Sequence, residues 1–107
     1  MSEAPKGEIE WFDQAGSLDR ESRTIRFYGI SGEGEKERTL NVAVRWEALE
    51  LLEGVQTEVR DQLRYSQILD THRARLEQIA ERKFARGDPL SRGYLVIGPK
   101  DLSLDRK

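Results

Sequence analysis

Residues 23–44 read RTIRFYGISGEGEKERTLNVAV, and this stretch decides the fold. In its first part Ile25 and Phe27 share one face while Arg26 lies on the other, which is the period of a β-strand. Its last part alternates in the same way, with three larger apolar side chains on one face: Leu40, Val42 and Val44. Both parts therefore predict strands that bury one face.

The residues between these strands are two glycines among charges, SGEGEKE. This composition is typical of a hairpin, so we expect antiparallel strands over 23–30 and 38–44 with a polar tip near Gly32 to Lys36. The glycines do not form a phosphate loop, because the Gly-Lys-Ser/Thr ending is missing and a strand follows instead of a helix.

A further short strand is expected before the hairpin, at EIEWF, residues 8–12. Residues 13–22 carry turn-forming residues and are expected to form a loop, and the polar residues 1–7 a flexible tail. The carboxylates in and next to the short strand could form an acid/base pair, but a charged edge strand that resists aggregation explains them equally well, and we favour the edge strand. These carboxylates are Glu8, Glu10 and Asp13.

Beyond Arg45 the period changes from that of a strand to that of a helix. Apolar residues at helical spacing predict a short helix from Trp46 that ends at Gly54. Residues 55–65 can be read as helix or loop. A long amphipathic helix follows over 66–86, with Gly87 as its cap and one stripe facing the core. The stripe is Leu69, His72, Leu76, Ile79, Ala80 and Phe84.

The apolar run GYLVIG, residues 93–98, predicts a last buried strand, and residues 103–107 a second flexible tail. The element order predicts a single α+β domain over 8–102. Three N-terminal strands and one C-terminal strand form a small, mostly antiparallel sheet, which a short and a long helix cover. The partner and the direction of the C-terminal strand stay open.

Composition limits the chemistry. The 107 residues contain 18 basic and 20 acidic side chains, one histidine and no cysteine, so the net charge of −2 offers no field for nucleic acid or anionic membranes. Without cysteine there are no disulfides or thiolate sites, which fits a cytoplasmic protein. No cofactor or metal is expected, because one histidine supplies too few ligands.

Three segments together resemble a known family. They are IRFYGISG followed by a strand and WEAL, the helix LDTHRARLEQIAERKFARG, and GYLVIGPKDL. This pattern is similar to that of domain-of-unknown-function family 1488, which consists of short bacterial proteins of unknown function. The resemblance covers roughly residues 8–102 and implies an α+β domain with an antiparallel sheet. It implies no activity.

His72 is the one residue that could act as a general base. It lies on the apolar stripe without a nucleophile in a recognisable setting, so we interpret it as structural.

The long helix separates its charges. Basic side chains gather on one flank of the stripe, and acidic side chains on the other. The basic flank consists of Arg75, Arg82 and Arg86, and the acidic flank of Asp70, Glu77 and Glu81. Both flanks could simply be solvated, or the basic flank could contact an acidic surface.

Arg73 differs from these three arginines because it lies beside the apolar stripe. An arginine there can lay its methylene groups on the sheet and carry its guanidinium to a carboxylate or a carbonyl. We expect a structural clamp between helix and sheet, with an anion site as the alternative.

These observations favour a small non-enzymatic interaction or accessory protein. It would self-associate or bind a protein partner through the charged helix or a sheet edge. The alternative is a weak nucleic-acid-binding module that uses the basic flank and aromatic residues such as Trp11 or Tyr28. Three arginines are few for phosphate-driven binding, and no membrane contact is expected.

Overall fold

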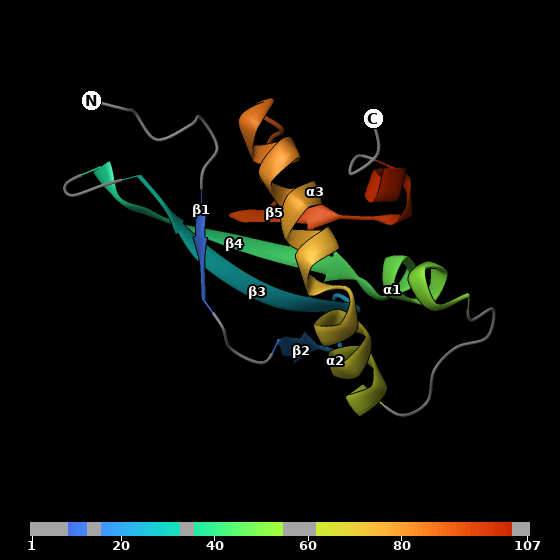
Figure 1. Cartoon of the computed structure of the whole chain (residues 1–107). Helices are drawn as coiled ribbons and strands as arrows, with labels where there is room; N and C mark the ends of the chain where they lie inside the picture. The colour runs from blue at the N-terminus through green and yellow to red at the C-terminus, as the bar shows by residue number, and fades with distance from the viewer. Residues whose placement is uncertain (1–8, 13–15, 33–35, 55–61, 104–107) are drawn as a thin grey trace.

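The computed structural model describes residues 9–12, 16–32, 36–54 and 62–103 (Figure 1). Within these residues a sheet has the strand order β1-β3-β4-β5, and β2 also pairs with β3. In chain order the elements are β1 (Ile9–Trp11), β2 (Ser17–Asp19), β3 (Thr24–Ser31), β4 (Arg38–Arg45), α1 (Trp46–Glu53), α2 (Gln62–Thr71), α3 (Arg73–Ala85), β5 (Tyr94–Ile97) and the 3₁₀ helix η2 (Pro99–Ser103). The predicted α+β fold with a mostly antiparallel sheet is confirmed.

The predicted hairpin is the centre of the sheet. β3 and β4 pair antiparallel over their whole length, from Thr24 opposite Arg45 to Ser31 opposite Arg38. Gly32 leaves β3 with a φ of +93°, and a Cβ there would lie 2.5 Å from the carbonyl oxygen of Lys36. The turn therefore requires a glycine at this position. Residues 33–35 of the tip lie outside the described residues.

β1 and β2 divide one edge of β3 between them. β1 pairs with the end of β3 and β2 with its beginning, both antiparallel. The prediction of a loop over 13–22 is therefore wrong at β2. This strand has a single apolar residue, Leu18, which lies opposite Ile25, so pairing with β3 forms it rather than any pattern of its own.

The structure gives the partner and the direction of β5, which the sequence left open. It lies beside β4 and runs parallel to it, with Asn41 opposite Tyr94 and Val44 opposite Ile97. The three α-helices lie in the connection between these two strands, which is the crossover that parallel neighbours need.

The core lies between one face of the sheet and the helices, and Figure 1 shows α2 and α3 crossing the sheet on one side. The predicted inward face of the hairpin is buried there. Trp46 at the start of α1 stacks on Tyr65 of α2, with ring centroids 4.5 Å apart. Many of the core side chains are fully buried, among them Ile25, Val42, Val44, Leu49, Leu69, Leu76, Ile79, Leu95 and Ile97.

The predicted long helix over 66–86 is instead two helices that meet at His72. The backbone of His72 leaves the helical region, with φ −108° and ψ 16°. The residue before it, Thr71, donates its hydroxyl to the carbonyl of Gln67 one turn earlier at 3.0 Å, a contact that bends helices. The apolar stripe continues across this break, so its period could not reveal it.

The predicted end of the helix is found at Gly87, which has a φ of +79°. The amide of Gly87 donates to the carbonyl of Phe84, and the amide of Asp88 to the carbonyl of Lys83, both at 3.1 Å. This is a Schellman cap, and glycine suits it because the left-handed conformation costs it nothing.

The predicted flexible tails and the segment read as helix or loop fall partly outside the described residues, which omit 1–7, 55–61 and 104–107. Ser103, predicted to begin the second tail, is instead the last residue of η2. Among the helices of the described residues, none combines the length and the apolar character needed to cross a bilayer.

Candidate interaction surface

The sheet has a second face, which no described helix covers and which we call the outer face. A row of side chains crosses its whole width. Tyr28 lies opposite Asn41, Asn41 opposite Tyr94, and the amide of Phe12 donates to the carbonyl of Tyr28 at 3.1 Å. We call these four residues the aromatic row. The Phe12 and Tyr28 rings lie 4.8 Å apart, and Tyr28 is 38% exposed.

The next row towards β2 holds Arg26, Ala43 and Val96 in neighbouring register positions. The guanidinium of Arg26 reaches across β4 to lie 4.4 Å from the centroid of the Tyr94 ring, a cation–π contact. It also pairs with Asp19 at 2.5 Å. This reach explains why Ala43 is only 5% exposed on a face without a covering helix.

The ionised carboxylate of Asp19 holds the guanidinium of Arg26 in place. The hydroxyl of Ser22 donates to its carboxylate at 2.6 Å, and this bond, helped by Arg26, lowers the pKa of Asp19 below its usual 3.8. The Arg26–Asp19 pair is therefore ionised at neutral pH.

A hollow of about 400 Å³ opens on the outer face beside the aromatic row. Ala43 and Val96 lie at its apolar part, while Arg26, Tyr94 and Arg92 line it from the sides. Arg92 is exposed and has a φ of +53°, which is unusual for a residue with a side chain. The outer face thus carries both a projecting ring, Tyr28, and a hollow.

The free edge of β5 offers little to another strand. Tyr94 exchanges two backbone hydrogen bonds with Ser91, and Asp101 satisfies both backbone groups of Gly98. Alternate residues of a strand direct their backbone N–H and C=O groups to the same edge, which here are Tyr94, Val96 and Gly98. Because Tyr94 and Gly98 are already bonded, only Val96 of these three can pair with another strand on this edge. At the opposite edge of the described sheet, β1 and β2 have three residues each.

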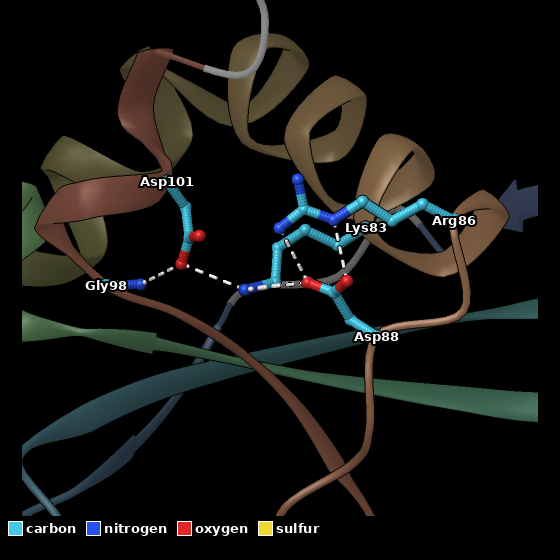
Figure 2. A network of polar contacts seen from close by, with 5 residues as sticks. All are labelled: Lys83, Arg86, Asp88, Gly98 and Asp101. Atoms are coloured by element: carbon cyan, nitrogen blue, oxygen red, sulfur yellow. Dashed lines mark hydrogen bonds and ion pairs between the residues drawn. The ribbon is translucent and has the colours of Figure 1, made fainter.

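A network of charges joins the end of α3 to the loop after β5 (Figure 2). Lys83 is 8% exposed, and its ammonium lies 2.9 Å from the carboxylate of Asp101 and 3.5 Å from that of Asp88. The same Asp101 oxygen accepts the amide of Gly98 at 2.9 Å. The network fixes helix, loop and strand together.

Arg86 belongs to this network and binds Asp88 through two nitrogens, at 2.6 and 2.8 Å. This bidentate bond lowers the pKa of Asp88, and the carboxylate in turn raises the pKa of Arg86. Arg75 donates to the carbonyl of Leu102 at 3.0 Å. Two of the three arginines of the predicted basic flank are therefore engaged within the chain, whereas the side chain of Arg82 is exposed and makes no hydrogen bond or ion pair with the described residues.

Two of the three residues of the acidic flank are engaged as well. Glu77 accepts from Arg73 at 3.2 Å, and Glu81 accepts the indole N–H of Trp11 at 2.8 Å. The Trp11 ring packs on the helix side of the sheet, 5.2 Å from Phe27. Trp11 is thus not an aromatic platform for a ligand, whereas Tyr28 lies on the outer face.

Arg73 lies at the start of α3 with its side chain 14% exposed. Its guanidinium donates to the carbonyl of Phe12 at 2.5 Å and lies 5.1 Å from the Phe27 ring centroid. These contacts reach from helix to sheet, as a clamp requires. Its contribution to stability stays a prediction.

His72 bonds within the chain too, with its Nε2 2.8 Å from a carboxylate oxygen of Glu53. It thereby ties the helix break to the end of α1. In the described part of the chain no three side chains of metal-binding type gather into a cluster.

Sequence reasoning missed the aromatic row and Lys83. The row is formed by residues of three strands and by Phe12, which follows β1, so no local pattern contains it. The sequence did indicate the burial of Lys83, because it follows Ile79 and Ala80 at the spacing of the buried stripe. A buried lysine is expected to pair with carboxylates.

Comparison with known proteins supports the fold. The chain resembles the crystal structure of a protein of unknown function from the DUF1488 family of Shewanella loihica PV-4, with a TM-score of 0.71 and 15% sequence identity. The alignment covers 89% of this chain and 96% of that protein. No family model matches the chain, and no curated protein matches it in sequence. The family that the three segments resemble is thus the family whose fold this chain has.

Proposed function

We propose that the chain is a non-enzymatic protein-interaction module and that the outer face is its contact surface. The aromatic row carries this proposal, because it places three rings across a sheet face that no described helix covers. Tyrosine and arginine are the side chains that most often anchor protein interfaces, and the outer face has both.

The charges of this face favour a protein over a nucleic acid. Arg26 is paired with Asp19, Arg45 is paired with Glu47 at 3.2 Å, and Glu10 is exposed beside the row. Binding to phosphates depends on many cations that are available together, and a net charge of −2 works against it. A mixed, partly aromatic surface fits another folded protein.

The two other surfaces considered from the sequence are less suited. On the basic flank of α3, Arg75 and Arg86 already bond within the chain. On the β5 edge, the backbone groups of the residues on both sides of Val96, Tyr94 and Gly98, are already hydrogen-bonded. Of the three surfaces, the outer face is the one that has both an exposed tyrosine and a hollow among the described residues.

Capture of partners from the native lysate with four baits tests the proposal: the parent chain, Leu51→Asp, Tyr28→Asp and Arg82→Glu. The parent chain and Leu51→Asp, a change at a 59% exposed residue of α1, are expected to retain the same proteins. Tyr28→Asp is expected to lose them, because it places a charge in the aromatic row. Retention by Tyr28→Asp together with loss by Arg82→Glu would contradict the proposal and return the contact to α3.

A further inference from the structure

We infer that the partner of the outer face is a second copy of this chain, with the Tyr28 ring of each copy seated in the hollow of the other. This inference rests on the proposed function and names its partner. A projecting ring and a hollow on one face are self-complementary, which is what a two-fold symmetric interface requires.

The spacing of ring and hollow permits both contacts at once. Tyr28 lies on β3 in the aromatic row, while Ala43 and Val96 of the hollow lie one row further, on β4 and β5. With strands about 4.8 Å apart and a rise of about 3.3 Å per residue, the Cα atom of Tyr28 lies roughly 10 Å from the point midway between Ala43 and Val96. A two-fold axis midway between them brings each ring over the hollow of the other copy.

The hollow also suits the size and chemistry of a tyrosine ring. A cavity of about 150 Å³ accepts benzene, and this hollow has about 400 Å³. Val96 offers apolar contact, Ala43 lies beneath Arg26, and Arg92 on the rim can lie against the face of the entering ring. The hydroxyls of Ser22 and Thr24 bond to each other, and Ser22 also donates to Asp19. Ser91, which lines the hollow too, provides a hydroxyl for the phenol group.

The charges agree with the same arrangement. Glu10 lies on the side of Tyr28 that points away from the hollow, opposite Ile30. Arg45 lies on the far side of the hollow, opposite Thr24. Exchange of ring and hollow between two copies therefore brings Glu10 of each copy towards the end of the sheet where Arg45 of the other lies, so opposite charges approach.

The size of the face predicts a weak dimer. Four strands about 4.8 Å apart and up to eight residues long give a face of roughly 500 Å², which is below the ~800 Å² per partner of standard specific interfaces. We therefore expect a dissociation constant in the micromolar range rather than an obligate dimer.

Sedimentation velocity over roughly 1 μM to 1 mM tests the inference, a range that brackets the expected constant. The parent chain should pass from monomer to dimer. Tyr28→Ala removes the ring and Val96→Phe fills the hollow, so each should weaken the dimer at least about tenfold, the effect of losing one well-packed contact. Leu51→Ala, at an exposed site on α1, should dimerise like the parent.

A mixture of Tyr28→Ala and Val96→Phe gives the most decisive sedimentation experiment. Tyr28→Ala keeps its hollow and Val96→Phe keeps its ring, so the mixture should form a heterodimer more readily than either variant forms a homodimer. Unchanged circular dichroism melts establish that each variant is folded. For a variant that fails to fold, Tyr28→Phe and Arg92→Glu replace it, with the dimer retained in the first and weakened in the second.

A monomer at every concentration, or a dimer that Tyr28→Ala leaves unchanged, would overturn the inference. If the chain is monomeric but Tyr28→Asp still loses captured proteins, the proposed function stands and only the second copy is wrong. Binding of a single-stranded oligonucleotide that Tyr28→Ala abolishes would overturn both.

Discussion

The guanidinium of Arg73 donates a hydrogen bond to the backbone carbonyl of Phe12, 61 residues earlier in the chain. Arg73 begins α3, and Phe12 directly follows β1. Because the Phe12 ring belongs to the aromatic row, this bond links the helix side of the sheet to the outer face. The contact between α3 and the end of β1 therefore also holds Phe12 of the candidate surface.

Arg73→Lys is expected to lower the free energy of unfolding by about 1 kcal/mol or more. Lysine keeps the charge but cannot reach Phe12 and Glu77 with a planar group, so charged hydrogen bonds are lost. Urea melts measure the change. Arg82→Lys is the matched control on the same helix and should stay within about 0.5 kcal/mol of the parent, as is usual for exposed sites. An Arg73→Lys melt equal to that of the parent would refute the clamp.

Arg75 is the one arginine of the basic flank for which the structure changes the expected result. The sequence groups it with Arg82 and Arg86 as an exposed position, yet it is half-buried and donates to the carbonyl of Leu102. Arg75→Lys should therefore lie between Arg82→Lys and Arg73→Lys in urea melts. A neutral result would show that η2 does not depend on this bond.

Lys83→Ala is expected to cost about 1.5–3 kcal/mol, the range for hydrogen bonds of charged groups, because Asp101 loses its buried ammonium. The double variant Lys83→Met with Asp101→Asn should recover part of this loss, since no carboxylate is then left without a partner. A double-mutant cycle of urea melts gives the coupling. Additive losses would mean that the two side chains do not act as a pair.

Acid should weaken the folded state partly through Asp88. Its pKa is lowered in the folded chain, mainly by Arg86, so its stabilising contribution is fully present above the usual carboxyl pKa of 3.8 and disappears as the pH falls through the lower folded value. Asp88→Asn should therefore show a smaller loss of stability between neutral pH and about pH 3. Asp70→Asn, at an exposed position of α2, is the control. Equal pH profiles for Asp88→Asn and the parent would contradict this assignment.

Two glycines with positive φ should respond differently to alanine. At Gly54, with φ +72°, a Cβ has nothing within 4 Å, so Gly54→Ala should cost about 1 kcal/mol through the backbone alone. At Gly32 the Cβ would also meet the carbonyl of Lys36, so Gly32→Ala should cost clearly more. Thermal melts compare the two. A smaller loss at Gly32 would mean that the hairpin turn relaxes freely.

Local pattern predicted the elements that bury one face by a regular period. The alternation around Phe27 and Val42 gave β3 and β4, and the helical spacing from Trp46 to Gly54 gave α1. The resemblance to family 1488 added the correct fold. Patterns could not give the break at His72, because apolar positions continue through it, nor β2, whose single apolar residue is Leu18.

The candidate surface depended on tertiary structure. The direction of β5 follows from the path of the helical crossover and not from GYLVIG itself, and only that direction places Tyr94 beside Asn41. The charged flanks of the helix were visible in the sequence, but their partners Leu102, Asp88 and Trp11 come from distant elements or from beyond the helix end. Sequence therefore indicated the charges and concealed that four of the six, Arg75, Arg86, Glu77 and Glu81, are engaged within the chain.

The most direct test of the outer face as contact surface is an amide and side-chain NMR comparison of dilute and concentrated samples of the parent chain. The account predicts concentration-dependent shifts that cluster at the aromatic row and the hollow, above all at Tyr28, Asn41, Arg92 and Tyr94, with little change along α3. Shifts that cluster around Arg82 would contradict the outer face as contact surface. So would spectra that do not change with concentration, if Tyr28→Asp also captures the same proteins as the parent chain.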